Sequence, residues 1–396
     1  MIAIESRAAQ ANVWSQTKRI ASVDIIDNLA AAETIWRGFE GPNHSVTPYQ
    51  RFDFLAPWQR EVGERGGLSP FIVIARDAAG RPRGLLPLAL QTTLGVRCAS
   101  FMGGTHANFN MGLWEREFAA AATEADLKAL LAMLAMSDEV DVLALRQQPL
   151  HWRDLQNPLW LLPHEPLAFD CPLRTIRSGA TAANLISNSL RRRLRNKERK
   201  LQPLAGYRYH IASADADITR LLDWFFRVKS QRLVRQKLHN VFAEPGVSEF
   251  IRAACKTKLP YGGRVIEIHA LECDEEVIAI WAVVADGNRF STMFNTYTLS
   301  GNARFSPGLL LMRHIIDRFI GQHGCSFDFG IGSDDYKREF CKDDEPTFDS
   351  NIPLTALGRL AAGAMSGVSG ARRLVKRNPA LLGVAQNLRS MFRQAA

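Results

Sequence analysis

The sequence predicts an α/β protein with mixed α+β sheets, built from two successive α/β units and a basic C-terminal tail. Three observations predict this organisation. The 396 residues are too many for one ordinary domain and suit two. Each half of the chain shows helical patterns, then a strand hairpin, then a further strand and helix. The intervening segment 151–171 contains three prolines, which is typical of a linker.

The first unit, 21–165, follows a polar and aperiodic stretch at 1–20 that we expect to be flexible. Helical periodicity predicts helices at 28–40, 53–65 and 124–137. Apolar runs predict strands at 71–75, 84–90, 99–103 and 140–145. A turn at 77–80 joins the first two strands in a hairpin. Pro87 places the second of them at a sheet edge or at a bulge.

The second unit, 166–355, repeats this order of elements without any repeat of residues. Its expected helices are 181–201, 218–236, 247–258, 307–321 and 333–341. Its expected strands are 264–273, 277–286, 290–298 and 326–329. An acidic turn at 274–276 joins the first two of these strands. The residues 356–396 form the basic tail.

Composition narrows the class of protein. No apolar run is long enough to span a membrane, and the first 20 residues lack the apolar core of a signal peptide. The six cysteines are scattered without a CxxC spacing, so neither a disulfide framework nor a thiolate metal site is expected. We therefore expect a cytoplasmic protein that holds no metal.

The net charge of +9 is concentrated at the C-terminal end. From Ser350 onward the chain has seven basic residues and no acidic one, so the rest is close to neutral. A nucleic-acid-binding surface over the whole fold is therefore not expected. Apolar residues scattered through 371–393 allow a peripheral amphipathic helix, which would contact the inner membrane or a partner in a synthesis complex.

The junction between strand 290–298 and helix 307–321 has the composition of an anion-binding site. Ser306 and Pro307 are ordinary helix-start residues, and that reading alone would explain them. A strand, a short loop and a helix N-terminus would also direct backbone N–H groups at a phosphate or pyrophosphate. Gly308 would let the ligand approach the backbone, and Arg304 would add positive charge.

The stretch SFDFGIGSDDYKREF, 326–340, ends an apolar strand on two glycines and then begins a charged helix. Asp328 points away from the face that carries Phe327 and Phe329. It is either a structural acid with a buried partner or a cleft residue with a shifted pKa. Tyr336 either donates a proton to a leaving group or packs with its hydroxyl at the rim.

The strand RVIEIHALEC places Glu267 and His269 side by side on one face. Such a pair could polarise a nucleophile, or it could be a solvated edge pair. The segment 189–201, SLRRRLRNKERKL, has seven basic residues around a narrow apolar stripe. It is either a solvated helix face or a contact for cofactor phosphates, an anionic polymer or acidic lipid.

The motif order resembles a known family. SPG at a helix start, FDFGIG and DYKREF follow one another near the C-terminus, after the basic LRRRLRNKERKL and RVKSQRL helices. Upstream come Pro57-Trp58, GLLPLAL and FMGG. Over roughly 40–350, the chain is similar to the CelD/BcsL-type acyltransferases of the GNAT superfamily, which are associated with bacterial cellulose and exopolysaccharide synthesis. Their architecture resembles the FemAB-type aminoacyl transferases, which carry two tandem GNAT-like domains.

The resemblance assigns roles to the same residues. It implies that the segment Arg304, Phe305, Ser306, Pro307, Gly308 and Leu309 cradles the pyrophosphate of acetyl-CoA or another acyl-CoA, although the usual loop has more glycines. It implies that Tyr336 protonates the departing thiolate. Asp328 and Lys337 would lie near the same cleft. Glu267, His269 or Asp328 would take the proton of the acceptor.

The resulting hypothesis is a direct acyl-CoA-dependent N- or O-acyltransferase with two tandem GNAT-like domains. The acceptor would be a hydroxyl- or amine-bearing sugar or envelope precursor. Two other readings stay open from the sequence. One is an aminoacyl-tRNA-dependent transferase of the FemAB kind, and the other is a non-catalytic accessory protein of a polysaccharide-synthesis complex.

Overall fold

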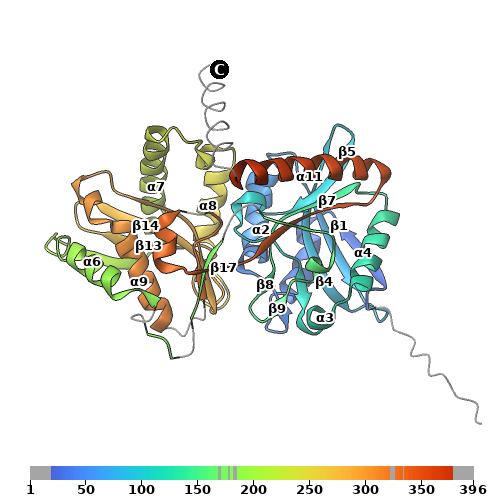
Figure 1. Cartoon of the computed structure of the whole chain (residues 1–396), viewed down its shortest axis with the longest axis horizontal. Helices are drawn as coiled ribbons and strands as arrows, with labels where there is room; N and C mark the ends of the chain where they lie inside the picture. The colour runs from blue at the N-terminus through green and yellow to red at the C-terminus, as the bar shows by residue number, and fades with distance from the viewer. Residues whose placement is uncertain are drawn as a thin grey trace, which may run out of the picture.

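The computed structural model describes residues 19–167, 171–176, 179–181, 185–321, 326–332 and 334–377. Two α/β domains lie side by side, each built around its own mixed sheet (Figure 1). The α/β prediction is therefore confirmed.

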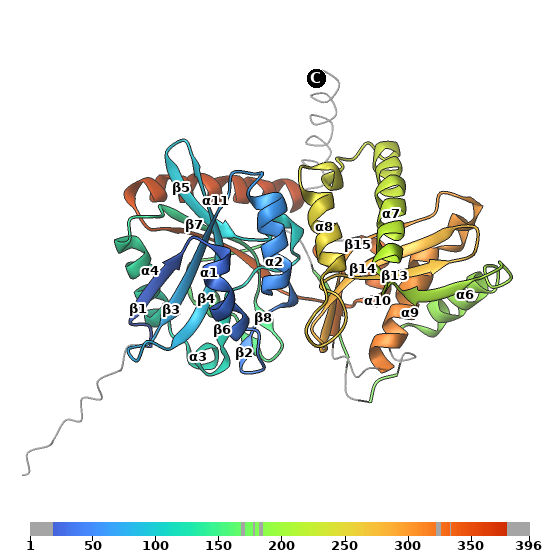
Figure 2. The same ribbon diagram turned by 180° about the vertical axis from the view of Figure 1, so that it is seen from behind.

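The first sheet has the strand order β1-β3-β4-β5-β7-β18-β10, and β2 and β6 are attached at β4. Its strands are β1 Ser22–Ile26, β2 His44–Ser45, β3 Ser69–Arg76, β4 Pro82–Thr93, β5 Val96–Phe101, β6 Leu113–Glu115, β7 Val142–Pro149, β10 Glu165–Pro166 and β18 Thr347–Pro353. Alternate residues of β3 enter two different cores. Helices α1 (Leu29–Gly38) and α2 (Phe52–Trp58) cover one face, and α4 (Glu124–Met136) covers the other (Figure 2).

The second sheet has the order β12-β13-β14-β15-β16-β11-β17. Its strands are β11 Pro172–Thr175, β12 Arg208–Ile211, β13 Glu267–Glu272, β14 Val277–Ala285, β15 Arg289–Tyr297, β16 Ser326–Asp328 and β17 Asp343–Asp344. Helices α6 (Asn188–Glu198) and α9 (Pro307–Gly321) pack on one face, and α7 (Asp215–Arg235) and α8 (Val247–Lys256) on the other. The remaining elements are α3 Arg116–Ala121, α10 Asp335–Phe340, the β8–β9 hairpin (His151–Trp152 and Leu155–Gln156) and the short turns η1 Pro48–Gln50, η2 Gln59–Gly63, η3 Gly104–His106, η4 Pro158–Leu161, η5 Val241–Ala243 and η6 Gly301–Phe305.

The two domains share one apolar core, which fixes their relative position. The cluster under α1 and α2 is continuous with the cluster under α7 and α8. Phe54 of α2 meets Phe250 of α8 edge to face, with ring centroids 5.3 Å apart. Such aromatic contacts add to the burial of area that drives folding.

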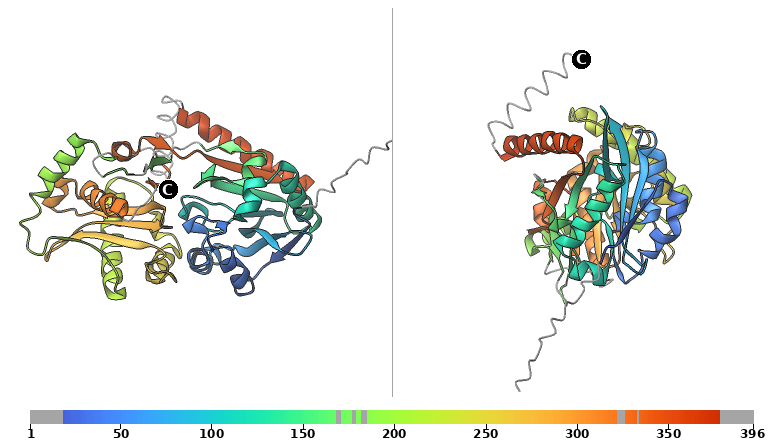
Figure 3. Two further views of the ribbon diagram at one scale, coloured as in Figure 1. Left: turned by 90° about the horizontal axis from the view of Figure 1, so that it is seen from below. Right: turned by 90° about the vertical axis from the view of Figure 1, so that its right-hand side faces the viewer.

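The C-terminal part of the chain returns to the first domain, which corrects the predicted boundary at 355/356. Strand β18 pairs antiparallel with β7, from Pro353 opposite Val142 to Thr347 opposite Pro149. The helix α11, Ala356–Arg377, then packs along β18, β7 and β5 (Figure 3). The segment 347–355 therefore completes the first sheet rather than the second. Its pairing partner is 200 residues away in sequence, so no local signal marks it.

Pro87 is also placed differently from the prediction, because β4 is an interior strand. On one side β4 pairs with β3 throughout, and Ile72 lies opposite Pro87. On the other side, β4 pairs with β6 up to Leu85 and with β5 from Leu88 onward. Pro87 lies in the gap between these two ladders, where its missing N–H costs no interstrand hydrogen bond.

The predicted tail is helical over 356–377, and 378–396, with most of the predicted amphipathic stretch, lies outside the described residues. Within the part of the chain that the structure describes, no helix is long and apolar enough to cross a membrane.

Candidate active site

Strands β15 and β16 part at the centre of the second sheet. They pair in parallel only from Arg289 opposite Ser326 to Ser291 opposite Asp328. Beyond that point β15 continues to Tyr297, while β16 ends. The chain leaves β16 through Gly330 and Gly332, which both have positive φ angles that glycine adopts without strain.

Asp328 holds this parting point together. Its side chain is fully buried. One oxygen accepts hydrogen bonds from Arg289 (2.8 Å) and Ser291, and the other accepts from the backbone N–H of Gly330 (2.9 Å). With both oxygens engaged, Asp328 ends the strand and orients the loop. These contacts fit the structural alternative for this acid.

Beyond the parting point, β15 presents a row of three side chains. A register shift opposite Ala282 and Val283 leaves Met293 without a partner on β14, which is a β-bulge. Met293, Asn295 and Tyr297 then alternate as the partly exposed residues of the strand. Tyr297 lies near the start of α9, since a Cβ on Gly308 would stand 3.7 Å from its ring.

The start of α9 is a tight junction that carries a cation. Ser306 adopts a left-handed conformation (φ 54°), which turns the chain from η6 into the helix. Lys197 of α6 donates a hydrogen bond of 2.6 Å to the Ser306 hydroxyl. Pro307 takes the first helical position, and exposed Arg304 stacks on Phe305. The helix start therefore combines its positive dipole end with an ammonium group.

Tyr336 lies against this helix start. Its ring contacts Trp281, whose indole N–H donates to the carbonyl of Gly308 (2.9 Å). Burial and then the Asp334 carboxylate raise the pKa of Tyr336 to about 12, while a hydrogen bond with the Asn295 side chain lowers it. With its pKa raised, the Tyr336 hydroxyl keeps its hydrogen at neutral pH.

We call Met293, Asn295, Tyr297, Ser306–Leu309 and Tyr336 the splay site. Lys337, next to Tyr336, is turned inward instead. Its ammonium group donates to the carbonyls of Gly330 and Ile331, each at 3.3 Å, and burial lowers its pKa. Lys337 therefore closes the loop after β16 and does not face the same space as Tyr336.

The basic face of α6 borders the splay site, because Lys197 of this helix contacts Ser306. A surface hollow of about 460 Å³ lies between α6 and Phe305, next to Ser306. Its polar lining comes from α6 and the turn that follows it: Ser189, Arg192, Arg193, Asn196, Lys197 and Lys200. No acidic residue is among these lining residues. Among the alternatives for the basic segment, the contact with phosphates is the one that this placement favours.

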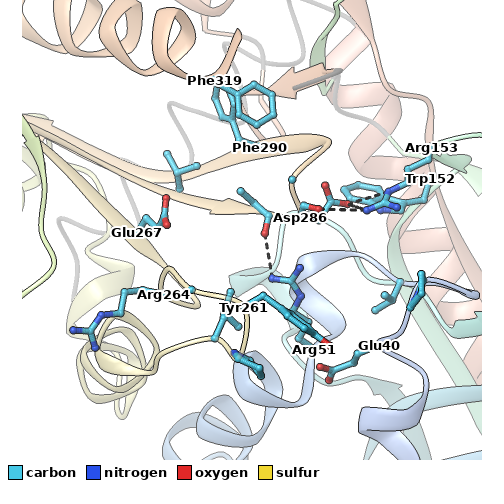
Figure 4. A pocket seen from close by; sticks show the side chains of 18 of the residues that line it. Glu40, Arg51, Trp152, Arg153, Tyr261, Arg264, Glu267, Asp286, Phe290 and Phe319 are labelled. Carbon is cyan, nitrogen blue, oxygen red and sulfur yellow. Dashed lines mark hydrogen bonds and ion pairs between the residues drawn. The ribbon is translucent and has the colours of Figure 1, made fainter. Parts of the chain in front are cut away.

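Glu267 and His269 lie elsewhere, in a pocket of about 600 Å³ between the two domains (Figure 4). The first domain contributes Glu40, Arg51, Trp152 and Arg153, and the second contributes Glu267, Asp286, Phe290 and Phe319. Phe319 is twelve residues from Pro307 in α9. None of the residues that line this pocket belongs to the splay site.

His269 is buried and its imidazole is already paired. Its Nδ1 lies 2.9 Å from the Tyr209 hydroxyl, and its Nε2 lies 3.8 Å from Glu267. Burial raises the pKa of Tyr209 to about 12. The structure thus brings Glu267 and His269 together, as predicted from their shared face. His269 lies opposite Trp281 of β14, and the Trp281 ring lies between it and Tyr336 in the chain of contacts.

A charged cluster joins α6 to α9 behind the helix start. Glu198 lies 2.6 Å from both the His314 imidazole and the Arg313 guanidinium. Burial raises the pKa of Glu198, but these two hydrogen bonds outweigh it and hold the pKa at about 2. The cluster fixes α6, and with it Lys197, against α9.

The pH dependence of stability should report this cluster. A depressed carboxyl pKa contributes stability above the unfolded value of 4.5, and the contribution disappears as pH falls towards about 2. Thermal midpoints measured from neutral pH down to about 2 should therefore fall less steeply in this range for Glu198→Gln than for the wild type. Glu339→Gln, in a more exposed pair with Arg193, is the control. Equal slopes for both variants would contradict the assignment.

The comparisons with known proteins agree with this geometry. Residues 188–338 match a family model described as an acetyltransferase (GNAT) domain. FemX is similar in structure, with a TM-score of 0.55 and 11% identity over 86% of this chain and 100% of that chain. A conserved protein of unknown function from Bacteroides thetaiotaomicron has a TM-score of 0.53 and 9% identity, and the match covers 83% of this chain and 99% of that chain. The C-terminal domain of a protein described as a lysylphosphatidylglycerol synthetase, from Agrobacterium fabrum, has a TM-score of 0.51. It is 10% identical, and the match covers 84% of this chain and 95% of that chain. No curated protein matches the chain.

The family match marks the second domain as a GNAT-type transferase domain, and a separate α/β domain precedes it in the fold. At these low sequence identities, the solved structures show only that the fold is similar. The acetyltransferase match falls on the domain that holds the splay site. The family match does not distinguish the CelD/BcsL-type acyltransferases from other GNAT-type proteins.

Proposed function

We propose that this protein is an acyl-CoA-dependent N- or O-acyltransferase that transfers the acyl group directly to its acceptor. The observation that carries the proposal is the meeting of a cation-bearing helix start with a protonated tyrosine where β15 and β16 part. With the CelD/BcsL resemblance, the acceptor is a hydroxyl- or amine-bearing sugar in polysaccharide, cellulose-related or cell-envelope metabolism.

The residues at the start of α9 suit the pyrophosphate of an acyl-CoA. Backbone N–H groups at a helix N-terminus bind anions, and Gly308 has no side chain to block their approach. Lys197 already reaches Ser306, and Arg304 is exposed one residue before Phe305. The basic hollow on α6 would receive further phosphate charge.

The reaction needs an electrophile held in place and a proton for the leaving group. The acceptor amine or hydroxyl attacks the thioester carbonyl, the C–N or C–O bond forms, and the C–S bond breaks. Backbone N–H groups near the bulge at Met293 would stabilise the oxyanion. Tyr336, neutral with a pKa of about 12, gives its proton to the thiolate.

The general base is assigned to none of the three predicted candidates. Asp328 has both oxygens hydrogen-bonded. Glu267 and His269 line the interdomain pocket, and the Nδ1 of His269 is already engaged with the Tyr209 hydroxyl at 2.9 Å. The acceptor proton is therefore expected to leave through water.

Calorimetric titration with acetyl-CoA and longer acyl-CoAs tests the binding part of the proposal. Lys197→Ala should weaken binding about tenfold, because a hydrogen bond or ion pair to a charged group contributes on the order of 1.5–3 kcal/mol. Arg304→Glu should weaken it as well. Arg195→Ala, an exposed cation on the same helix that does not line the hollow, is the matched control. Equal weakening by all three variants would reduce the effect to net charge.

The two other readings predict different results in the same titration. An aminoacyl-tRNA-dependent transferase would bind tRNA with a steep dependence on salt and ignore acyl-CoA. An accessory protein would bind neither. The fold likeness to FemX does not separate these donors, whereas the titration does.

A further inference from the structure

The exposed large apolar side chains of this protein gather at one edge. Among the described residues there are nine of them. One, Tyr261, lines the interdomain pocket. The other eight belong to the β4–β5 hairpin, the end of α4, the end of α7 with the connection that follows it, and α11. The hairpin, α11 and the α7–α8 connection lie along the edge that is uppermost in Figures 1 and 2. We call this set the apolar edge: Leu94, Met136, Val234, Leu238, Val241, Leu357, Leu360 and Val368.

The residues of the first domain come together through α11. Leu94 is 99% exposed at the tip of the β4–β5 hairpin, and Met136 is 76% exposed at the end of α4. The start of α11 is held beside both, because Thr355 donates to Asp141 (2.8 Å) and Arg97 binds Asp138 and Asp141. The tip of the β4–β5 hairpin, the end of α4 and the start of α11 therefore each carry an exposed apolar side chain.

The outer face of α11 lacks the charges that a solvated helix face normally carries. Its exposed residues from 356 to 371 are Ala356, Leu357, Arg359, Leu360, Gly363, Ala364, Gly367, Val368 and Ala371. Only Arg359 is charged. Leu360 is 75% exposed and Val368 is 53% exposed. An apolar face of this length facing water is costly unless something covers it.

The second domain adds a similar patch at the same edge. Val234 lies in the last turn of α7, and Leu238 and Val241 follow in the connection to α8, which stands level with α11 in Figures 1 and 2. Val234 is 70% exposed. Arg235 and Lys237 lie between these apolar residues in the sequence. Apolar side chains with interspersed cations are typical of surfaces that enter a lipid interface.

Charge identifies the partner. The chain has seven basic and no acidic residues from Ser350 onward, and α11 lies within this segment. Near the edge, Asp138 is paired with Arg97 and Glu244 with His239, and Glu139 is a further exposed acid. A second copy of the chain would bring its own basic segment against this one, which is unfavourable. An anionic surface is complementary to it.

We infer that the apolar edge binds the surface of an anionic lipid bilayer, with the side chains of both domains inserted among the lipids. The inference is independent of the acyl-transfer proposal. It uses no residue of the splay site, and a protein that binds vesicles without transferring acyl groups would satisfy it.

Flotation of the full chain with vesicles tests the inference. The wild type should float with vesicles of equal parts phosphatidylglycerol and phosphatidylcholine, and much less with phosphatidylcholine alone. Leu360→Glu combined with Val368→Glu should weaken flotation at least tenfold, since transferring each apolar side chain from water is worth about a tenfold change or more. Tyr261→Glu, an equally exposed apolar residue off the edge, should float like the wild type.

A second pair, Val234→Glu with Leu238→Glu, repeats the test on the other domain and does not depend on the folding of α11. Unchanged flotation of either charged pair, or equal flotation with both vesicle types, would overturn the inference. Sedimentation without vesicles tests whether a second copy of the chain covers this edge instead. If the wild type is a dimer and the variant with Leu360→Glu and Val368→Glu is a monomer, the edge is a self-association surface and the lipid inference is overturned.

Discussion

Replacing Tyr336 by Phe is expected to lower kcat about 100-fold, while the affinity for acyl-CoA changes little. A positioned general acid typically contributes 10²–10⁴-fold in rate. The substitution removes only the hydroxyl and keeps the ring against Trp281 and Phe329. Because the pKa of Tyr336 is raised to about 12, its proton is present throughout the neutral range, and Phe has none to give.

Steady-state rates and calorimetric titration of the same preparation separate the two effects. Tyr207→Phe is the matched control. Tyr207 is also partly buried with a raised pKa, but its hydroxyl donates to Glu198, away from the splay site. Turnover that survives Tyr336→Phe would remove this residue from the mechanism. A loss of acyl-CoA binding with unchanged kcat would make it a binding residue.

Replacing Arg289 by Met is expected to destabilise the protein by about 3–5 kcal/mol, because removing one partner of a buried ion pair leaves uncompensated charge. Arg289 is 5% exposed. It donates to Asp328 (2.8 Å) and Glu345 (2.9 Å). Its guanidinium also lies over the rings of Phe109 and Trp152, at 4.8 and 4.6 Å.

These contacts join three parts of the chain, which is why the expected effect is large. The two rings belong to the first domain, Asp328 ends β16, and Glu345 precedes the strand that returns to the first sheet. Burial raises the pKa of Glu345 even though Arg289 opposes this effect. Without Arg289, two buried carboxyl groups would face each other.

Urea and thermal denaturation measure this loss. Arg193→Met is the control, because its pair with Glu339 is largely exposed and such pairs contribute about 1 kcal/mol or less. Adding Asp328→Asn and Glu345→Gln to Arg289→Met should recover part of the stability, since it removes the uncompensated charges. A single variant as stable as the Arg193 control would show that the aromatic packing alone holds this junction.

Much of the site could be predicted from local sequence. Helix α9 occupies 307–321 as expected, because Ser306, Pro307 and the apolar periodicity are local signals. The strands of the 264–298 meander were predicted within a few residues for the same reason. Tyr336 and the helix start are only 30 residues apart in the chain, and the fold brings them together. Their roles in catalysis and binding stay predictions.

Lys197, Asn295 and the face of α6 were harder to single out. The sequence marks α6 as basic, but its five basic residues do not reveal which one meets Ser306. That choice depends on the angle at which α6 packs on α9, which Glu198 and His314 set. Contacts between elements more than 100 residues apart leave no local pattern.

By itself, the sequence determined the α/β class, most elements of both domains and the concentration of positive charge at the C-terminal end. These depend on periodicity, capping and composition, which act over a few residues. Only the tertiary structure decided that β18 and α11 complete the first domain, that Arg289, Ser291 and the Gly330 N–H occupy both oxygens of Asp328, and that Glu267 and His269 line the interdomain pocket. Those outcomes depend on which distant surfaces bury one another, and hydrophobic burial is not directional enough for a single strand or helix to specify its partner.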